Sequence, residues 1–475
     1  CWTMMTSARS RGKSKVSSDV VHHIPDVTVR YDLLVPHPSR PYVAVCQETA
    51  GYSLPWLEPV EHHTAVVAHI ASLARQKYGL EAVAVRILSY QHEREQAAQF
   101  RLYQLDNWTG QVELPAGLVW LAEADLAELA LAHVAYWPAL EAWFAERQGR
   151  VPIPDERVPW ARPGWYQRLR YWLEKTLAAN HWGHANKIEL YRAWSISAGL
   201  WVATDQGRFY VKASPPQFRR ETGVTRFLAE QLPTLYPEVV ATDEAEGWLL
   251  MRASAAEPLL AQTDISRWQE ALARYAGRQQ ASRVRRDEFA DLGCPVRGLA
   301  ELATEAERLV TEPKWLRPEP GVAFTDEELA QFKALLPELQ RICKHYAVAG
   351  LAPTLVHGDF HPGNILYGRD GPIFIDWSDA CWSHPFMDLA IFLLEDFGNP
   401  AAINEQMALV VEAYLASWSA EKPLAELRAE FDALGPVAIL FHALSFVRIV
   451  ANLEPSARWE MHNVVPWLVR QLLTT

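Results

Sequence analysis

The sequence predicts an α+β protein of two or three domains. Its 475 residues exceed the usual size of one domain, and an apolar fraction of 49% is ample for packed cores. Strand-like and helix-like stretches alternate up to about residue 254, whereas residues 255–475 have mainly helical spacing. A polar, Pro-rich segment at 146–164 separates the first strand-rich region from the second.

The N-terminal region, residues 20–145, combines several strands with two helices. Alternating or apolar stretches predict strands at 28–35, 42–46, 83–88, 100–105 and 118–121. One helix is predicted at 62–78, where Gly79 supplies the stop, and another in the Ala/Leu-rich stretch near 123–133. This region is therefore predicted as a separate α/β domain.

The order of these elements resembles a Nudix domain. Nudix hydrolases place a Gly, several Glu and an Arg in a box before and within the first helix. Aligned on Gly79 and Leu80, the box positions hold Glu58, Thr64, Ser72, Leu73, Gln76 and Lys77. Because Mg²⁺ requires carboxylate oxygens and no glutamate pair is present, the resemblance implies a catalytically empty Nudix-like domain. A divergent α+β domain without that ancestry fits the pattern nearly as well.

The linker and a connecting helix predicted at 165–179 together make up residues 146–187. A second strand-rich segment then covers residues 188–254. Strands are predicted at 188–194, 200–203 and 208–213, with a tight turn over Ser197–Leu200 whose Ser197 and Gly199 carry little bulk. The third strand ends in Lys212. A helix at 216–232 and a strand at 247–252 follow.

The stretch Leu355-Val-His-Gly-Asp-Phe-His-Pro-Gly-Asn-Ile-Leu366 carries the clearest chemical signal. Four residues separate Asp359 from Asn364, and a second apolar run delivers Asp376. These side chains match the parts that γ-phosphoryl transfer from ATP needs: a carboxylate that accepts the proton of the attacking hydroxyl, and an amide and a second carboxylate that hold Mg²⁺. Protein kinases space their catalytic-loop Asp and Asn in the same way, although Gly358 stands where they carry Arg.

This motif, with Ile375-Asp-Trp377 and Asp388-Leu-Ala390, resembles the aminoglycoside phosphotransferase and choline kinase family. The resemblance is strong over the motif and weaker from Ile188 to the C-terminus. It implies a protein-kinase-like two-lobed fold, with a nucleotide-binding small lobe at 188–254 and a helical catalytic lobe at 255–475. His357 then orients the catalytic loop by hydrogen bonds.

The family order also assigns roles in the small lobe. Ser197 and Gly199 would lie over the triphosphate, and Lys212 would contact the α- and β-phosphates, although a lone Lys at a strand end is usually solvated. Its carboxylate partner would be Glu221, with Glu230 as the second choice. Backbone groups near two hinge residues, Met251 and Arg252, would meet the adenine.

The remaining helices are predicted at 266–279, 298–310, 325–347, 386–396, 403–418 and 436–452. The third opens with a capping box at Thr325–Glu328, and Pro337 is expected to kink or break it. Asp388 lies in an apolar run and is interpreted as a buried brace of the catalytic loop. His442 and Arg448 are candidates for the acceptor side, and core or surface roles suit them equally.

Composition limits the partners. The formal net charge of −12 argues against nucleic acid. Five dispersed cysteines indicate reduced thiols in the cytoplasm, and the apolar runs are shorter than a membrane span. Residues 1–19 are rich in Ser, Arg and Lys and are predicted to be a disordered tail, with Met4 or Met5 as candidate starts.

The sequence therefore predicts an ATP- and Mg²⁺-dependent phosphotransferase that acts on a hydroxyl of a small molecule such as an aminoglycoside, a sugar, choline or an amino alcohol. The alternatives are a nucleotide-sensing, pseudokinase-like binding protein that signals through its N-terminal domain, and a Nudix hydrolase with a kinase-like appendage. Intact Asp359, Asn364, Asp376 and Lys212 disfavour the first, and the empty box disfavours the second. The acceptor, the choice of ATP or GTP and the oligomeric state stay open.

Overall fold

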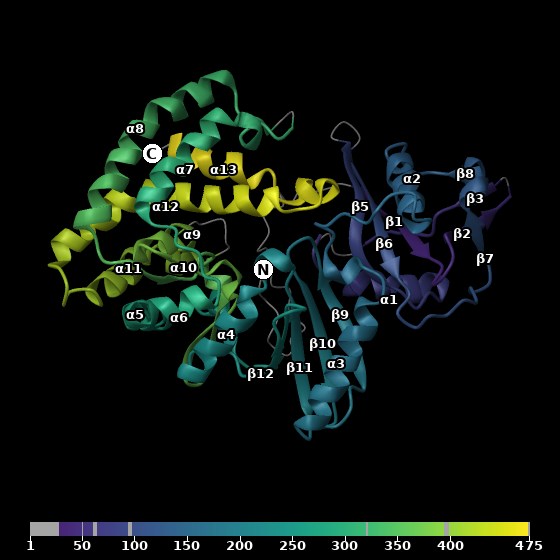
Figure 1. The fold of residues 1–475 in the computed structure, drawn as a ribbon, viewed down its shortest axis with the longest axis horizontal. Coiled ribbons are helices and arrows are strands. Elements are labelled where there is room, and N and C mark those ends of the chain that lie inside the picture. Colours follow the sequence, from purple (N-terminus) through teal and green to yellow (C-terminus); the bar gives the residue numbers. More distant parts are fainter. Residues whose placement is uncertain are drawn as a thin grey trace. The chain divides into compact units, whose positions relative to one another are not determined.

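The computed structural model describes residues 28–49, 51–59, 64–93, 97–319, 322–393 and 399–473, so the predicted tail at 1–19 lies outside it. The described chain forms two compact units. The N-terminal unit ends at Pro215 and includes the later segment Leu453–Arg458, and the C-terminal unit contains Pro216–Asn452 and continues from Trp459. Both units mix helices and strands, which confirms the α+β class (Figure 1).

The N-terminal unit is built on a mixed eight-stranded sheet (Figure 1). Its strands are β1 (Thr28–Pro36), β2 (Tyr42–Glu48), β3 (Gly51–Ser53), β4 (Trp56–Leu57), β5 (Val83–Glu93), β6 (Ala98–Asp106), β7 (Leu118–Ala122) and β8 (Leu129–Ala130). The main order is β5-β6-β1-β2-β3-β8, with β4 paired to β1 and β7 to β2. β1 runs parallel to β6, whereas β5 and β6 are antiparallel. The five strands predicted for this region are therefore present.

Three helices accompany this sheet: α1 (Ala68–Tyr78), α2 (Tyr136–Arg147) and α3 (Trp165–Ala179). Gly79 ends α1 in the left-handed conformation, as predicted. The helix predicted near 123–133 is wrong, because Glu123–Glu128 form a 3₁₀ turn and Leu129 pairs with β3 as a strand. Strand pairing and the burial of Leu129 override the helical spacing there.

The last strands of the N-terminal unit are β9 (Lys187–Ala193), β10 (Ala198–Thr204) and β11 (Gly207–Ala213), paired antiparallel in sequence order. The turn between β9 and β10 covers residues 194–197, three positions earlier than predicted, and Trp194 N donates to Ser197 O across it at 3.2 Å. Gly199 therefore lies within β10, directly opposite Lys212 on β11.

The C-terminal unit begins with α4 (Arg220–Gln231) and the antiparallel pair β12 (Val239–Asp243) and β13 (Trp248–Arg252). Short strands then form two small sheets: β14 (Glu257–Pro258), β16 (Ile365–Gly368) and β17 (Gly371–Phe374) in one, and β15 (Thr354–Val356) and β18 (Cys381–Ser383) in the other. The helices are α5 (Ile265–Ser282), α6 (Arg286–Asp291), α7 (Leu299–Thr311), α8 (Asp326–Ala349), α9 (Leu389–Phe392), α10 (Ala401–Asn404), α11 (Met407–Ala416), α12 (Leu424–Ala451) and α13 (Val464–Leu473).

Three predicted helices differ in continuity or extent. α8 has the predicted capping box, in which Thr325 and Glu328 bond to each other's backbone N–H groups, but it continues through Pro337 without a break. α12 begins at Leu424 rather than at Pro436, which lies inside the helix. The predicted helix at 386–396 is short, since only Leu389–Phe392 are α-helical among its described residues, and 394–398 lie outside the description.

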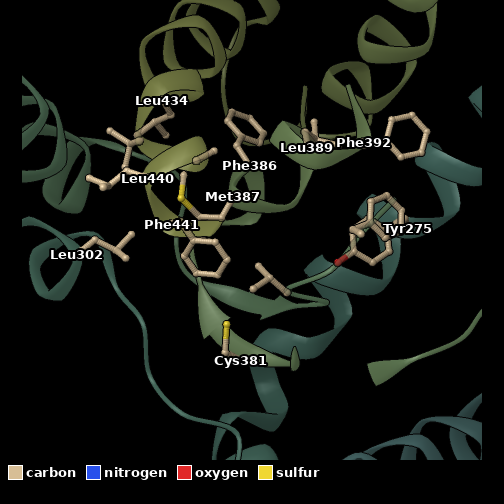
Figure 2. Close-up of a cluster of buried hydrophobic side chains, with 14 of the residues drawn as sticks. Tyr275, Leu302, Cys381, Phe386, Met387, Leu389, Phe392, Leu434, Leu440 and Phe441 are labelled. Carbon is tan, nitrogen blue, oxygen red and sulfur yellow. The ribbon is translucent and has the colours of Figure 1, made fainter. Parts of the chain in front are cut away.

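The core of the C-terminal unit collects apolar side chains from α12 and the segment before α9. Leu434, Leu440 and Phe441 lie near Phe386 and Met387 (Figure 2). Within the described chain, α12 is long and apolar enough to cross a membrane, so the expectation that no apolar stretch reaches that length is wrong for this helix. Its most apolar window is 67% buried in the protein.

Candidate active site

The catalytic-loop motif is held by one buried carboxylate. Strand β15 leads into His357-Gly358, whose backbone N–H groups donate to Asp388 at 2.9 and 2.8 Å. The Tyr275 hydroxyl donates to the same carboxylate and accepts from the His357 N–H at 3.0 Å. Burial raises the pKa of Asp388 to about 6, and these three hydrogen bonds oppose the rise. The predicted brace is therefore present.

The His357 ring joins the two ends of the motif. Its Nε2 lies 2.8 Å from the Ile375 carbonyl, and its Nδ1 lies 3.3 Å from the Asp359 backbone nitrogen. Since a carbonyl only accepts and an amide N–H only donates, the neutral ring carries its proton on Nε2. His357 thus positions the residue after Gly358 and the residue before Asp376, as predicted for an orienting role.

Gly358 is required by the backbone at this corner. Its φ is +82°, and a Cβ built there would overlap the backbone of Asp379. A side chain such as the Arg of protein kinases therefore cannot occupy this position without moving the loop.

Asn364 lies against Asp359 in the expected way. Its Nδ2 donates to the Asp359 carbonyl at 2.8 Å and to the Asp359 carboxylate at 3.2 Å. Its Oδ1 is buried and has no hydrogen-bond partner among the described residues. A buried carbonyl-type oxygen without a partner costs free energy unless a ligand or ion satisfies it.

Three carboxylates of this region, those of Asp359, Asp376 and Asp379, lie close enough to act on one another. Asp376 has the left-handed φ of +67°, which is uncommon for a residue other than Gly and aims a side chain where regular strand geometry would not. Loss of hydration, followed by the charges of Asp379 and Asp376, raises the pKa of Asp359 to about 7. Burial likewise raises the pKa of Asp379, although the charges of Arg220 and Arg297 oppose the rise.

The nearby histidine does not supply a positive charge. His361 Nε2 lies 3.8 Å from the Asp359 carboxylate, but burial lowers the pKa of His361 well below its usual range, so the ring is neutral.

These residues fit Mg²⁺ better than a metal held by protein alone. Across the described ranges, no group of three or more His, Cys, Asp or Glu side chains is placed to bind a metal ion. Mg²⁺ is usually held by one or two carboxylates together with water and substrate phosphates. Asp376 and the partnerless Oδ1 of Asn364 offer that incomplete oxygen set.

The predicted phosphate contacts lie together in the N-terminal unit. Lys212 is buried rather than solvated, at 4% exposure, and faces Gly199 across the β10–β11 pair. A Cβ on Gly199 would overlap the Tyr210 hydroxyl, so the small residue is needed for packing inside the strand. Ser197 accepts from Trp194 Nε1 at 2.9 Å in the turn. This hairpin is therefore tightly built around Lys212.

Glu221 lies in the first turn of α4 and is buried, whereas the second choice, Glu230, is largely exposed near Arg226. The structure thus favours Glu221 as the functional carboxylate. Lys212 and Glu221 belong to different units, so their pairing stays a prediction.

The structure bears on one backbone group of the predicted hinge. Met251 is buried in β13 opposite Val239, and the Arg252 N–H already donates to Glu238 O at 2.9 Å. That N–H cannot also donate to adenine without breaking its bond to Glu238.

The acceptor candidates on α12 serve other roles. Burial lowers the pKa of His442 to about 3, and its Nε2 donates to the Met387 carbonyl at 2.9 Å. Arg448 is largely exposed and bonds to Glu305. His442 therefore supports the chain next to Asp388. The contacts of His442 and Arg448 give neither of them a role in binding an acceptor.

The Nudix-box positions in α1 carry no metal-binding side chain. Ser72 and Gln76 are exposed, and Lys77 lies with its ammonium 3.6 Å from the Trp56 ring centroid. The domain's likeness to Nudix proteins stays a prediction.

Sequence reasoning missed two residues of the site. Asp379 follows Asp376 by three positions in a 3₁₀ turn, Trp377–Asp379, and its acidic side chain in the Asp-Trp-Ser-Asp stretch could have been noticed. Tyr275 contacts Asp388 across 113 residues, and no local pattern announces such a contact.

One protein-family model matches the middle of the chain. Residues 194–429, just under half of it, match the model described as "Phosphotransferase enzyme family". The matched segment includes Lys212, Glu221 and the whole catalytic loop. No curated protein matches the sequence.

Solved structures give weaker likenesses. A macrolide 2'-phosphotransferase type I is 17% identical and covers 63% of this chain and 97% of its own, with a TM-score of 0.44. A choline kinase from Streptococcus pneumoniae is 14% identical and covers 65% and 100%, with the same score. An ethanolamine kinase from Plasmodium vivax is 10% identical, covers 60% and 83%, and scores 0.43. At scores below 0.5, these likenesses do not bear on the acceptor.

Proposed function

We propose that the protein transfers the γ-phosphoryl group of ATP to a hydroxyl group of a small molecule, with Mg²⁺ as cofactor, and the match of residues 194–429 to the phosphotransferase enzyme family model supports this. The observation that carries this proposal is the catalytic-loop geometry. Asn364 donates to the carboxylate of Asp359, Asp376 lies close enough to act on that carboxylate, and the buried amide oxygen of Asn364 has no partner among the described residues.

Asp359 is the group that receives the acceptor's proton. Its pKa, raised to about 7 by loss of hydration and by neighbouring carboxylates, suits a base that works near neutral pH. The amide of Asn364 holds this carboxylate at 3.2 Å and so fixes its direction. His357 and Asp388 hold the backbone on which it stands.

Asp376 and the Oδ1 of Asn364 would hold Mg²⁺. The ion would neutralise phosphate charge during a loose transition state. The chain's own contribution is then positioning, because phosphoryl transfer needs little covalent chemistry from the protein. The excess of negative charge around Asp359 supports a cation at this place.

Lys212 would contact the α- and β-phosphates, with Glu221 as its ion-pair partner. The burial of both charged side chains supports this, since buried charges are almost always paired. The proposal includes three further points: the nucleotide is ATP rather than GTP, Lys212 and Glu221 pair with each other, and the protein is cytoplasmic.

The competing function is a nucleotide-binding protein without transfer. The experiment is ATP consumption by the purified full-length chain across small alcohols, amino alcohols, sugars and aminoglycosides, beside the Asp359→Asn variant. Acceptor-dependent consumption that the variant lacks supports transfer. Thermal stabilisation by Mg-ATP, with equal background consumption by both proteins and every acceptor, would favour the binding protein.

A further inference from the structure

A cavity of about 380 Å³ lies within the N-terminal unit. It is formed by the end of β6, by α2 and by the segment that leads into α3, with Gln104, Asp106, Arg147 and Arg157 among its lining residues. The volume falls at the lower end of the range of small-molecule sites, roughly 300–1,000 Å³. No step of the proposed phosphoryl transfer uses it.

Two of the three arginines that line the cavity are already neutralised. Arg86 donates to Glu454 at 3.1 Å. Arg157 donates to Glu454 at 2.7 Å and to Glu146 at 2.7 Å. Two carboxylates therefore balance two guanidinium groups, and this part of the wall has little net charge to offer a ligand.

Arg147 is different. Its Nη2 donates to the carbonyls of His37 at 2.9 Å and Pro38 at 2.7 Å, which fixes the side chain without neutralising it. Over the described part of the chain, no carboxylate lies within ion-pair distance of Arg147. The guanidinium thus has no ion-pair partner and keeps further N–H groups on the cavity wall, although its charge acts on the nearby carboxylate of Asp106.

Hydroxyl-binding groups stand beside it. Gln104 and Asp106 are two positions apart on β6, so their side chains share one face of the strand. Gln104 Oε1 accepts from Arg86 Nε at 2.7 Å, which leaves its amide N–H₂ as a donor. Burial raises the pKa of Asp106, while the charge of Arg147 opposes the rise, so its oxygens sit in a poorly hydrated place where a hydroxyl donor would bind well.

We propose that this cavity, the Arg147 pocket, binds a small polyhydroxylated anion of the sugar phosphate or sugar acid type. The anionic group would pair with Arg147, and hydroxyl groups would bond to Gln104 and Asp106.

The test is isothermal calorimetry on the full-length protein with three probes that share a carbon skeleton: glucose 6-phosphate, gluconate and glucose. At least one anion should bind and glucose should not. Binding of glucose 6-phosphate alone assigns a phosphate ester, and binding of gluconate alone assigns a carboxylate. Failure of both anions at millimolar concentration, or equal binding of glucose, would overturn the proposal.

Two sets of variants locate the binding. Arg147→Gln should lower the affinity for the anion roughly ten- to a hundredfold, which is the contribution of a charge-assisted hydrogen bond. Arg150→Gln, which removes an exposed arginine paired with Glu123 at the same end of α2, should change nothing. Unchanged affinity in Arg147→Gln would place the anion elsewhere and sink the idea.

Arg147 also holds two backbone carbonyls, so its loss can affect folding. A second pair of variants therefore leaves Arg147 unchanged. Gln167 is exposed on the rim of the pocket. Gln167→Glu should therefore lower the affinity for the anion, and Gln167→Lys should raise it. Equal affinities in the two would contradict the proposal. Asp359→Asn should strongly lower transfer and leave anion binding intact, which separates failure of this pocket from failure of the proposed enzyme.

Discussion

In the C-terminal unit, Asp359, Asp376 and Asp379 bring carboxylates close enough to act on one another, and the charges of Arg220 and Arg297 do not prevent the rise in the pKa of Asp379. In the N-terminal unit, Arg86, Arg157, Glu146 and Glu454 form an equally sheltered cluster in which every charge has an opposite partner. Burial and the neighbouring carboxylates raise the pKa of Asp359. The pKa of Glu454 is instead lowered, because its two arginines outweigh the effect of burial.

The contrast separates two uses of buried charge. A balanced cluster holds the chain together by itself and needs nothing from outside. An unbalanced cluster costs free energy until a ligand completes it, so it marks a site that works on something the protein does not contain. The predictions below test this division at both clusters.

The largest effect is expected at the base. Asp359→Asn should lower transfer by roughly 10²–10⁴-fold, the usual range for a general base, because the variant keeps the shape and loses the proton acceptor. Mg-ATP should still raise the melting temperature, since Asp376 and Asn364 are unchanged. A transfer assay beside melting curves with and without Mg-ATP measures both, and near wild-type transfer would remove Asp359 from its role.

A smaller and graded effect is expected at the proposed Mg²⁺ ligands. Asp376→Asn removes a negative ligand, so activity should fall at every Mg²⁺ concentration. Asn364→Ala removes a neutral ligand, so its loss should be smaller and partly restored by high Mg²⁺. Activity titrated against Mg²⁺ for both variants decides the point, and identical curves for the two would contradict these roles.

The brace should respond in stability rather than in ligand dependence. Asp388→Asn turns one acceptor into an N–H₂ group that faces the backbone N–H groups of His357 and Gly358. The free energy of unfolding should drop by about 2–3 kcal/mol, with or without Mg-ATP. Denaturant melts would show this, and lost transfer at unchanged stability would mean that Asp388 acts in the chemistry.

How much of this could be predicted depended on distance along the chain. The catalytic loop was predicted because Asp359, Asn364 and Asp376 lie within one short stretch, and β15 to β17 follow from apolar runs on either side. The turn before Gly199 was misplaced by the side chain of Trp194, which bonds to Ser197 and closes the turn early. Contacts such as Arg86 with Glu454, 368 positions apart, have no local signal at all.

The balanced cluster gives the smallest and most selective prediction. Glu454→Gln leaves Arg86 and Arg157 with one carboxylate, Glu146, so the N-terminal unit should lose about 1–2 kcal/mol of stability. Because the folded pKa of Glu454 lies below its unfolded value of about 4.3, its contribution is present above that pH and is lost as pH falls through the folded pKa. The variant should therefore lose less stability than the wild type on acidification below about pH 4.3.

The matched control is Glu123→Gln, which breaks a more exposed pair with Arg150 in the same unit and should cost less than about 1 kcal/mol. Denaturant melts of both variants between neutral and acidic pH measure the two differences. Equal losses in the two variants would mean that the Glu454 cluster is no more than a surface ion pair. Lost transfer at full stability in Glu454→Gln would mean that the cluster, although balanced, takes part in the reaction.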